Sequence, residues 1–242
     1  MTSVTNRYRA GHGSGSAPRG SRTGRLWVGF SSLAIAAFTV GPYLTASLAQ
    51  LARDDAGLAS AYSGQPLPVR LAFYAHLGFA GLALVLGPWQ FSARIRGRRP
   101  ALHRVLGRVY LVCVGVGAAA ALALAPFNSA ALVGFFGFGA LAVLWAYTGW
   151  RAYRAIRGRD VPGHQAWMIR NFALTYAGVT LRLWVPALMA VQVLTGSAGD
   201  RFATAYAAVP FLCWLPNLVV AERIVRRRGL PSYRVVSAAP AR

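Results

Sequence analysis

The sequence contains no lysine, and only five acidic residues oppose its 26 arginines. Charged residues make up 13 %, about half the usual share of a soluble domain. Only two cysteines are present, too few for a disulfide framework, and both Cys113 and Cys213 lie in apolar runs. The glycine motifs of nucleotide-binding proteins and the usual hydrolase signatures are absent. The sequence therefore indicates no independent soluble enzyme activity.

Long apolar runs dominate what is present. Hydrophobic residues make up 56 % of the 242 residues, and the mean hydropathy is +0.44. A helix needs about 20 apolar residues to cross a bilayer, and six runs reach that length without the alternation of barrel strands. We therefore predict an all-α polytopic membrane protein with six transmembrane helices. These lie near residues 27–49, 69–91, 105–125, 130–150, 171–194 and 203–224.

The arginines alternate between the predicted links. Twenty-two of the 26 fall in the two terminal segments and in the links after the second and fourth spans, while three fall in the other links. The positive-inside rule then predicts that both termini are cytoplasmic, in a bacterial inner membrane. Although a net charge of +21 is typical of nucleic-acid binders, these arginines interrupt apolar runs and form no water-facing stripe. The expected partner is the lipid bilayer, and no nucleic acid is expected.

The composition also divides the chain into three parts. Residues 1–24 are rich in Gly, Ser and Arg and predict a disordered basic cytoplasmic tail, and residues 229–242 predict a second tail. Residues 25–228 form the predicted six-helix membrane domain. The first apolar run has the length of a span, which favours an uncleaved anchor over a signal peptide.

A pattern of six residues occurs twice, 61 residues apart. Trp89, Ile95-Arg96-Gly97-Arg98 and His103 recur as Trp150, Ile156-Arg157-Gly158-Arg159 and His164. Each copy joins an inward-running helix to an outward-running one. The repeat predicts a four-helix core of spans two to five with a pseudo-two-fold axis along the membrane normal.

His103 and His164 begin the third and fifth spans, which are diagonal in an up-and-down four-helix bundle. Two imidazoles at one level, with arginines nearby for the propionates, are what a bis-histidine haem b requires. The alternatives are that both are interfacial residues that cap helices or bind headgroups, or that they bind another metal. No metal other than haem iron is expected there, because a third ligand is missing.

A second polar group lies deeper in the bilayer. Asn171, Thr175 and Arg182 share a predicted helix face. Counting residues along each helix places Arg182 and His76 at a similar depth below the outer membrane surface. No acidic residue lies within a span, so Arg182 has no intramembrane ion-pair partner. These four residues predict an outer-leaflet pocket for a quinone or an anionic lipid, the alternative being a hydrogen-bonded core.

The residues around these sites resemble a known family. The stretches Gly87–Phe91, His103–Tyr110 and His164–Arg170 are similar to those of uncharacterised bacterial multi-span membrane proteins, a domain of unknown function. A looser likeness, in architecture alone, is to cytochrome b561-type four-helix membrane cores. The fourth span contains no histidine, which departs from the two-haem pattern of those proteins.

The function that we predict from the sequence is that of an integral membrane protein which acts through its helical core. The sequence leaves the cofactor unknown; our hypothesis is one haem b between His103 and His164, with a quinone or a membrane redox or assembly partner as the candidate partner. A non-catalytic membrane assembly or interaction factor is the alternative, and a small transporter is a third.

Overall fold

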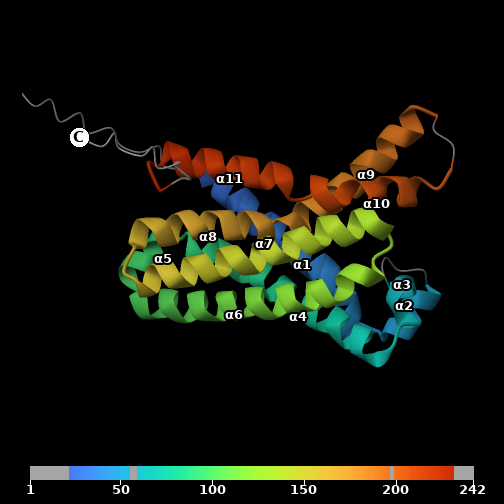
Figure 1. The fold of residues 1–242 in the computed structure, drawn as a ribbon, viewed down its shortest axis with the longest axis horizontal. Helices are drawn as coiled ribbons and strands as arrows, with labels where there is room; N and C mark the ends of the chain where they lie inside the picture. The colour runs from blue at the N-terminus through green and yellow to red at the C-terminus, as the bar shows by residue number, and fades with distance from the viewer. Residues whose placement is uncertain (1–21, 55–58, 197–198, 232–242) are drawn as a thin grey trace, which may run out of the picture.

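The structure, a computed structural model, describes residues 22–54, 59–196 and 199–231. Within these residues every regular element is helical, and the long helices run along a common direction (Figure 1). Six segments are long and apolar enough to cross a membrane, as the sequence predicts. They are Arg22–Thr45, Leu67–Gln90, Pro100–Phe127, Ala131–Arg157, Val161–Leu194 and Arg201–Arg227.

The first four segments each contain one long helix. These are α1 (Arg22–Thr45), α4 (Leu67–Gln90), α6 (Pro100–Leu124), which continues as a short 3-10 turn (Ala125–Phe127), and α7 (Ala131–Arg157). Helices α1, α4 and α6 begin before their predicted spans and α7 ends after its own, because arginines and interfacial residues continue a helix beyond the apolar core. Helix α1 begins at Arg22, so it includes the last three residues of the predicted tail of residues 1–24. Residues 1–21 and 232–242, where the rest of the two predicted tails falls, lie outside the described part.

The last two segments are each broken into two helices. The sixth consists of α10 (Arg201–Leu212) and α11 (Leu215–Arg227), as Pro210 and Pro216 predict. Asn217 compensates the break, because its Nδ2 donates to the carbonyl of Cys213 at 3.1 Å.

The break in the fifth segment separates α8 (Val161–Thr175) from α9 (Ala177–Leu194), and no proline lies there. The hydroxyl of Tyr176, the residue between the two helices, forms a 2.7 Å hydrogen bond with Ser31 of α1. The predicted start of this span at Asn171 is wrong by about ten residues, because α8 begins at Val161.

Four helices form the core. Helix α4 packs on α6, α6 on α7, α7 on α8, and α8 on α4, so that α6 and α8 face each other across the bundle. Tyr110 and Val114 of α6 are fully buried at the centre, together with Trp145 of α7. Gly87 of α4 lets Phe172 of α8 approach closely, since a Cβ there would lie 2.3 Å from the ring.

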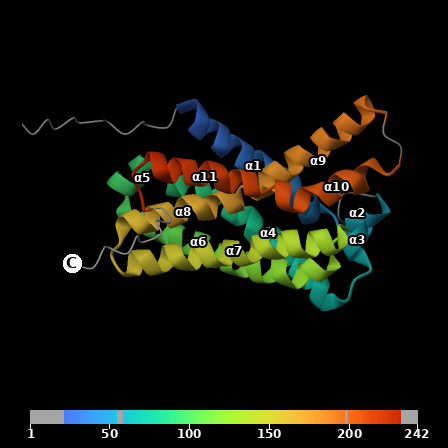
Figure 2. The same ribbon diagram turned by 45° about the horizontal axis from the view of Figure 1, so that its top comes forward.

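The other helices cover this core unevenly. Helix α1 packs on α4 and α9, while α11 packs on α8. Helix α9 leans away from the bundle (Figure 2), while α10 packs on α9 and on α7 of the core. Leu183, Val191 and Leu194 of α9 are 50 %, 54 % and 86 % exposed, which suits contact with lipid chains.

The two ends of the bundle differ in charge. One end, here called the Arg-rich end, holds the short helix α5 (Ala93–Arg98), the starts of α6 and α8, and the end of α11 (Figure 1). The opposite, Arg-poor end holds α2 (Leu48–Arg53) and α3 (Ala59–Ser63). A capping box at Ser47 and Gln50 begins α2. These three short helices are too short to be found from hydropathy.

Candidate functional site

His103 and His164 lie on diagonal helices at the Arg-rich end. Each is half-buried near the start of its helix, in α6 and α8. The two imidazoles are close enough for the charge of one to act on the other. The structure therefore places the two histidines that the repeat singles out at the same end of the bundle, within electrostatic range of each other.

The two rings differ in their hydrogen bonds. Nδ1 of His164 lies 2.9 Å from the carbonyl oxygen of Ala152 in α7, which orients the ring and leaves Nε2 available. Nδ1 of His103 is buried without a hydrogen-bond partner. Nε2 of Gln90, at the end of α4, is likewise buried and unpartnered. Unpaired buried polar atoms are costly and rare, so both mark a place where a ligand would restore hydrogen bonds.

Small and basic residues adjoin His103. Gly107 lies one turn further along α6, where an added Cβ would stand 3.2 Å from Oε1 of Gln90. The positive charges of Arg96 and Arg104 act on His103. Arg96 also reaches the carbonyl of Gln90 with Nη1, at 3.5 Å. Sequence reasoning gave Gln90 no role, because a single glutamine at a helix end carries no signal of its own.

A closed network of hydrogen bonds fills the core beyond the histidines. The hydroxyl of Tyr110 donates to Oδ1 of Asn171 at 2.6 Å and lies 2.8 Å from Oγ1 of Thr175. Nε1 of Trp145 donates to the same Oγ1 at 2.9 Å. Asn171 uses Nδ2 to donate to Oγ1 of Thr148 at 2.9 Å. Asn171 and Thr175 therefore have partners within the protein and join α6, α7 and α8.

His76 and Arg182 lie on the other side of this network. Nδ1 of His76 is 2.9 Å from the carbonyl of Gly117, and its ring meets Trp145 edge to face with 6.5 Å between centroids. The charge of Arg182 acts on His76. Thr175 reaches this pair only through Trp145, because the break at Tyr176 separates it from Arg182.

Arg182 lies near two tyrosines, and no ion pair compensates its charge within the described residues. Its Nη1 donates to the carbonyl of Gly178 at 2.9 Å. Tyr43 of α1 and Tyr206 of α10 are near enough to interact electrostatically with it. Within the described part of the chain no carboxylate forms an ion pair with this guanidinium. A half-buried cation in this setting is suited to a neutral polar or an anionic ligand.

Sequence reasoning missed one ion pair. Arg170, assigned to a cytoplasmic link, lies inside α8 and donates from Nη2 to Oε2 of Glu222 in α11 at 2.8 Å. The guanidinium also lies 4.9 Å from the ring centre of Trp167. Hydropathy cannot detect such a pair, because each charge alone resembles the end of a span.

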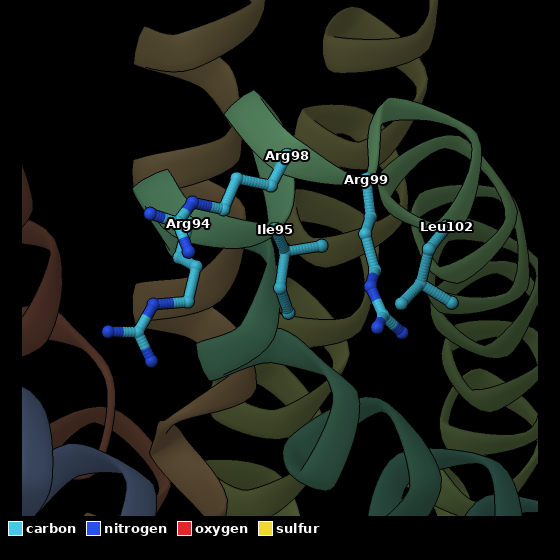
Figure 3. Close-up of a pocket in the computed structure, with 5 residues that line it drawn as sticks. All are labelled: Arg94, Ile95, Arg98, Arg99 and Leu102. Atoms are coloured by element: carbon cyan, nitrogen blue, oxygen red, sulfur yellow. The ribbon is translucent and has the colours of Figure 1, made fainter.

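Two cavities open at the Arg-rich end, one beside each copy of the repeated link. The first has a volume of about 370 Å³ and lies between α5 and the start of α6 (Figure 3). The second, of about 430 Å³, lies between the end of α7 and the start of α8. In the described residues, no three His, Cys, Asp or Glu side chains gather as a metal site would require.

Comparison with known proteins gives a family but no activity. Residues 73–225 match the model of a family described as predicted membrane protein (DUF2306). The chain belongs to this family. The match covers α4 to α11 and therefore includes both histidine sites, and it agrees with the multi-pass membrane architecture. No curated protein and no solved structure matches the chain.

Proposed function

We propose that this DUF2306 protein binds one haem b between His103 and His164 at the Arg-rich end of its core. The orientation of His164 is the observation that carries the proposal. Its Nδ1 is held by the carbonyl of Ala152, which would leave Nε2 free to bind iron. A haem with two imidazole ligands transfers single electrons.

The surroundings of the two histidines fit such a group. Gly107 has no side chain on the face of α6 beside His103, but the side chain of Gln90 lies against it, so a porphyrin edge there would require Gln90 to move. Arg96 and Arg104 would bind the propionates, and the unpartnered Nε2 of Gln90 would donate to one of them. The propionates would provide counter-charges for the two arginines and a hydrogen-bond acceptor for Nε2 of Gln90.

The repeat supports the same arrangement. Tyr110 and Asn171, which hydrogen bond to each other, are 61 residues apart, as are His103 and His164. Residues that a two-fold axis relates meet each other when they lie on that axis. The proposed pseudo-two-fold axis therefore runs between α6 and α8, and it would carry the two imidazoles to equal depth.

The proposed orientation in the membrane follows the arginines. The Arg-rich end would face the cytoplasm of a bacterial cell, with both termini on that side. A reporter active only in the cytoplasm, fused after Arg228, should be active, and one fused after Gly64 should be inactive. The reverse pattern would contradict this orientation.

The proposed second site lies at the Arg-poor end and takes a quinone. The Arg182 guanidinium would donate to a quinone carbonyl and His76 would bind the other side, with Trp145 linking the site to Thr175 and Asn171 in the core network. The uncompensated charge of Arg182 supports this assignment, because it would stabilise the anion formed when a quinone is reduced. An anionic lipid shares this chemistry and is the competing occupant.

The absorption spectrum of the detergent-purified protein, oxidised and then reduced with dithionite, tests the haem proposal. We expect b-type bands that disappear in His103→Ala and in His164→Ala and persist in His76→Ala. Added imidazole should restore the bands in the two ligand variants, which shows that each remains folded. A spectrum without haem bands, from cells supplied with haem, would contradict the proposal and favour the assembly-factor alternative.

A further inference from the structure

The cavity at α5 contains positive charge without compensation. Arg94, Arg98 and Arg99 line it together with Ile95 and Leu102. Figure 3 shows Arg94 and Arg99 on either side of Ile95, with their guanidinium groups extending in the same direction. Within the described residues, none of the three guanidiniums forms an ion pair or contacts an aromatic ring.

The cavity beside the second copy of the repeat is different. There the guanidinium of Arg151 donates to the hydroxyl of Tyr147 at 2.7 Å and lies 4.6 Å from the ring centre of Trp167. Arg154 lies 5.1 Å from the ring centre of Trp150, and Asp160 adds a carboxylate. The arginines of this cavity therefore have hydroxyl and aromatic partners within the protein, and those of the first cavity have neither an ion pair nor an aromatic ring among the described residues.

The level of the first cavity is that of lipid headgroups. It lies where the apolar helix α4 has ended at Gln90 and α6 is beginning at Pro100. Trp89, in the last turn of α4, is 54 % exposed, as expected for a tryptophan at the membrane interface. Ile95 and Leu102 give the cavity an apolar side that a glycerol backbone and the first acyl carbons would cover.

We propose that this cavity binds the phosphate of an anionic phospholipid headgroup. The planar guanidinium donates two parallel hydrogen bonds to phosphate oxygens, and three of them around one cavity would share a single phosphodiester. Basic cavities between membrane helices at the cytoplasmic surface recognise such lipids in this way. This site is distinct from the histidine site and does not depend on haem.

Native mass spectrometry of the full chain with added lipid tests this site. Phosphatidylglycerol is compared with phosphatidylcholine of the same acyl chains, and the variants remove two charges from one cavity or the other. We expect at least tenfold weaker phosphatidylglycerol binding in Arg94→Gln/Arg99→Gln, and less than twofold weakening in the matched Arg151→Gln/Arg154→Gln variant. Replacing Arg94 and Arg99 with Lys keeps the charge but loses the planar fork, and should weaken binding to an intermediate degree.

Three results would overturn the proposal. Equal weakening in the two Gln variants would mean that net charge alone attracts the lipid. Equal binding of the two lipids would mean that the cavity does not distinguish an anionic headgroup from a zwitterionic one. Complete displacement of phosphatidylglycerol by millimolar inorganic phosphate would identify a site for the free anion instead. Thermal unfolding of both double variants verifies that each is folded before lipid is added.

Discussion

Tyr110 and Asn171 hydrogen bond to each other at 2.6 Å across the core, although they stand 61 residues apart in the chain. The same interval separates His103 from His164, seven residues earlier on the same two helices. Residues seven apart lie on one helix face, so the hydrogen bond and the two imidazoles occupy the facing sides of α6 and α8. Tyr110 and Asn171 thus hold together the helices that carry the proposed ligands.

Removing the hydroxyl of Tyr110 tests the importance of this hydrogen bond. Tyr110→Phe leaves Oδ1 of Asn171 without its donor in a fully buried site, and we expect the free energy of unfolding to fall by about 1 kcal/mol. Thermal unfolding in detergent measures the change. Tyr153→Phe, at a residue that is 48 % exposed, is the matched control and should have no measurable effect. Equal stability of the two variants would contradict a structural role for the network.

The ion pair between α8 and α11 gives a second prediction. Glu222→Ala leaves the buried guanidinium of Arg170 without its carboxylate, so we expect a loss of about 2 kcal/mol and a loosened α11. Arg226→Ala removes the exposed partner of Glu222, 3.6 Å away, and should change stability by less than about 0.5 kcal/mol. The rate of limited proteolysis at α11, compared between the two variants, measures directly how far α11 is loosened from α8. Equal losses of stability in the two variants would mean that the buried pair stabilises the protein no more than the exposed one.

Packing of the α10 helix on α7 depends on Gly137. A Cβ at this position would lie 2.5 Å from Cβ of Pro210 and 2.9 Å from its carbonyl oxygen, and the backbone cannot yield cheaply. Gly137→Ala should therefore destabilise the protein by about 1–3 kcal/mol. At Gly115, a Cβ meets nothing within 4 Å, so Gly115→Ala should be neutral or slightly stabilising. Melting temperatures of the two variants measure this difference. Equal melting temperatures would contradict the close packing of Gly137 against Pro210.

The proposed quinone site predicts a kinetic effect. Arg182→Gln removes the charge that would stabilise a reduced quinone, and we expect reoxidation of the dithionite-reduced protein by a short-chain quinone to slow at least tenfold. Stopped-flow absorption at the haem band measures this rate, and an unchanged haem spectrum shows that the first site is intact. The matched control is Arg201→Gln at the start of α10, outside the Tyr43 and Tyr206 cluster. An unchanged rate in Arg182→Gln would favour an anionic lipid there.

The positions of the spans could be predicted because membrane insertion depends on a local property, the apolar length of a segment. Pro210 and Pro216 likewise act locally, and they flank the break between α10 and α11 in the sixth segment. The break at Tyr176 has no such local cause. Its partner Ser31 comes from α1, 145 residues away, and a single sequence contains no sign of that contact.

The candidate site could be predicted only in part, for the same reason. His103 and His164 stand in a repeat, and the repeat places them on diagonal helices whatever the details of packing. The partners that give them chemistry, the carbonyl of Ala152 and the side chain of Gln90, depend on how α7 and α4 rotate about their own axes. Asn171 and Thr175 show the converse, since their polar stripe predicts a pocket face while their contacts are hydrogen bonds to Tyr110 and Trp145.

The most direct test of the central claim is the haem content of the purified protein together with its iron spin state. Extraction of haem as its pyridine complex, measured against protein concentration, should give one haem b per chain. Electron paramagnetic resonance of the oxidised protein should show low-spin iron with two imidazole ligands, and His103→Ala and His164→Ala should each abolish that signal. A haem content near zero, or a high-spin signal that survives both substitutions, would contradict haem ligation by His103 and His164.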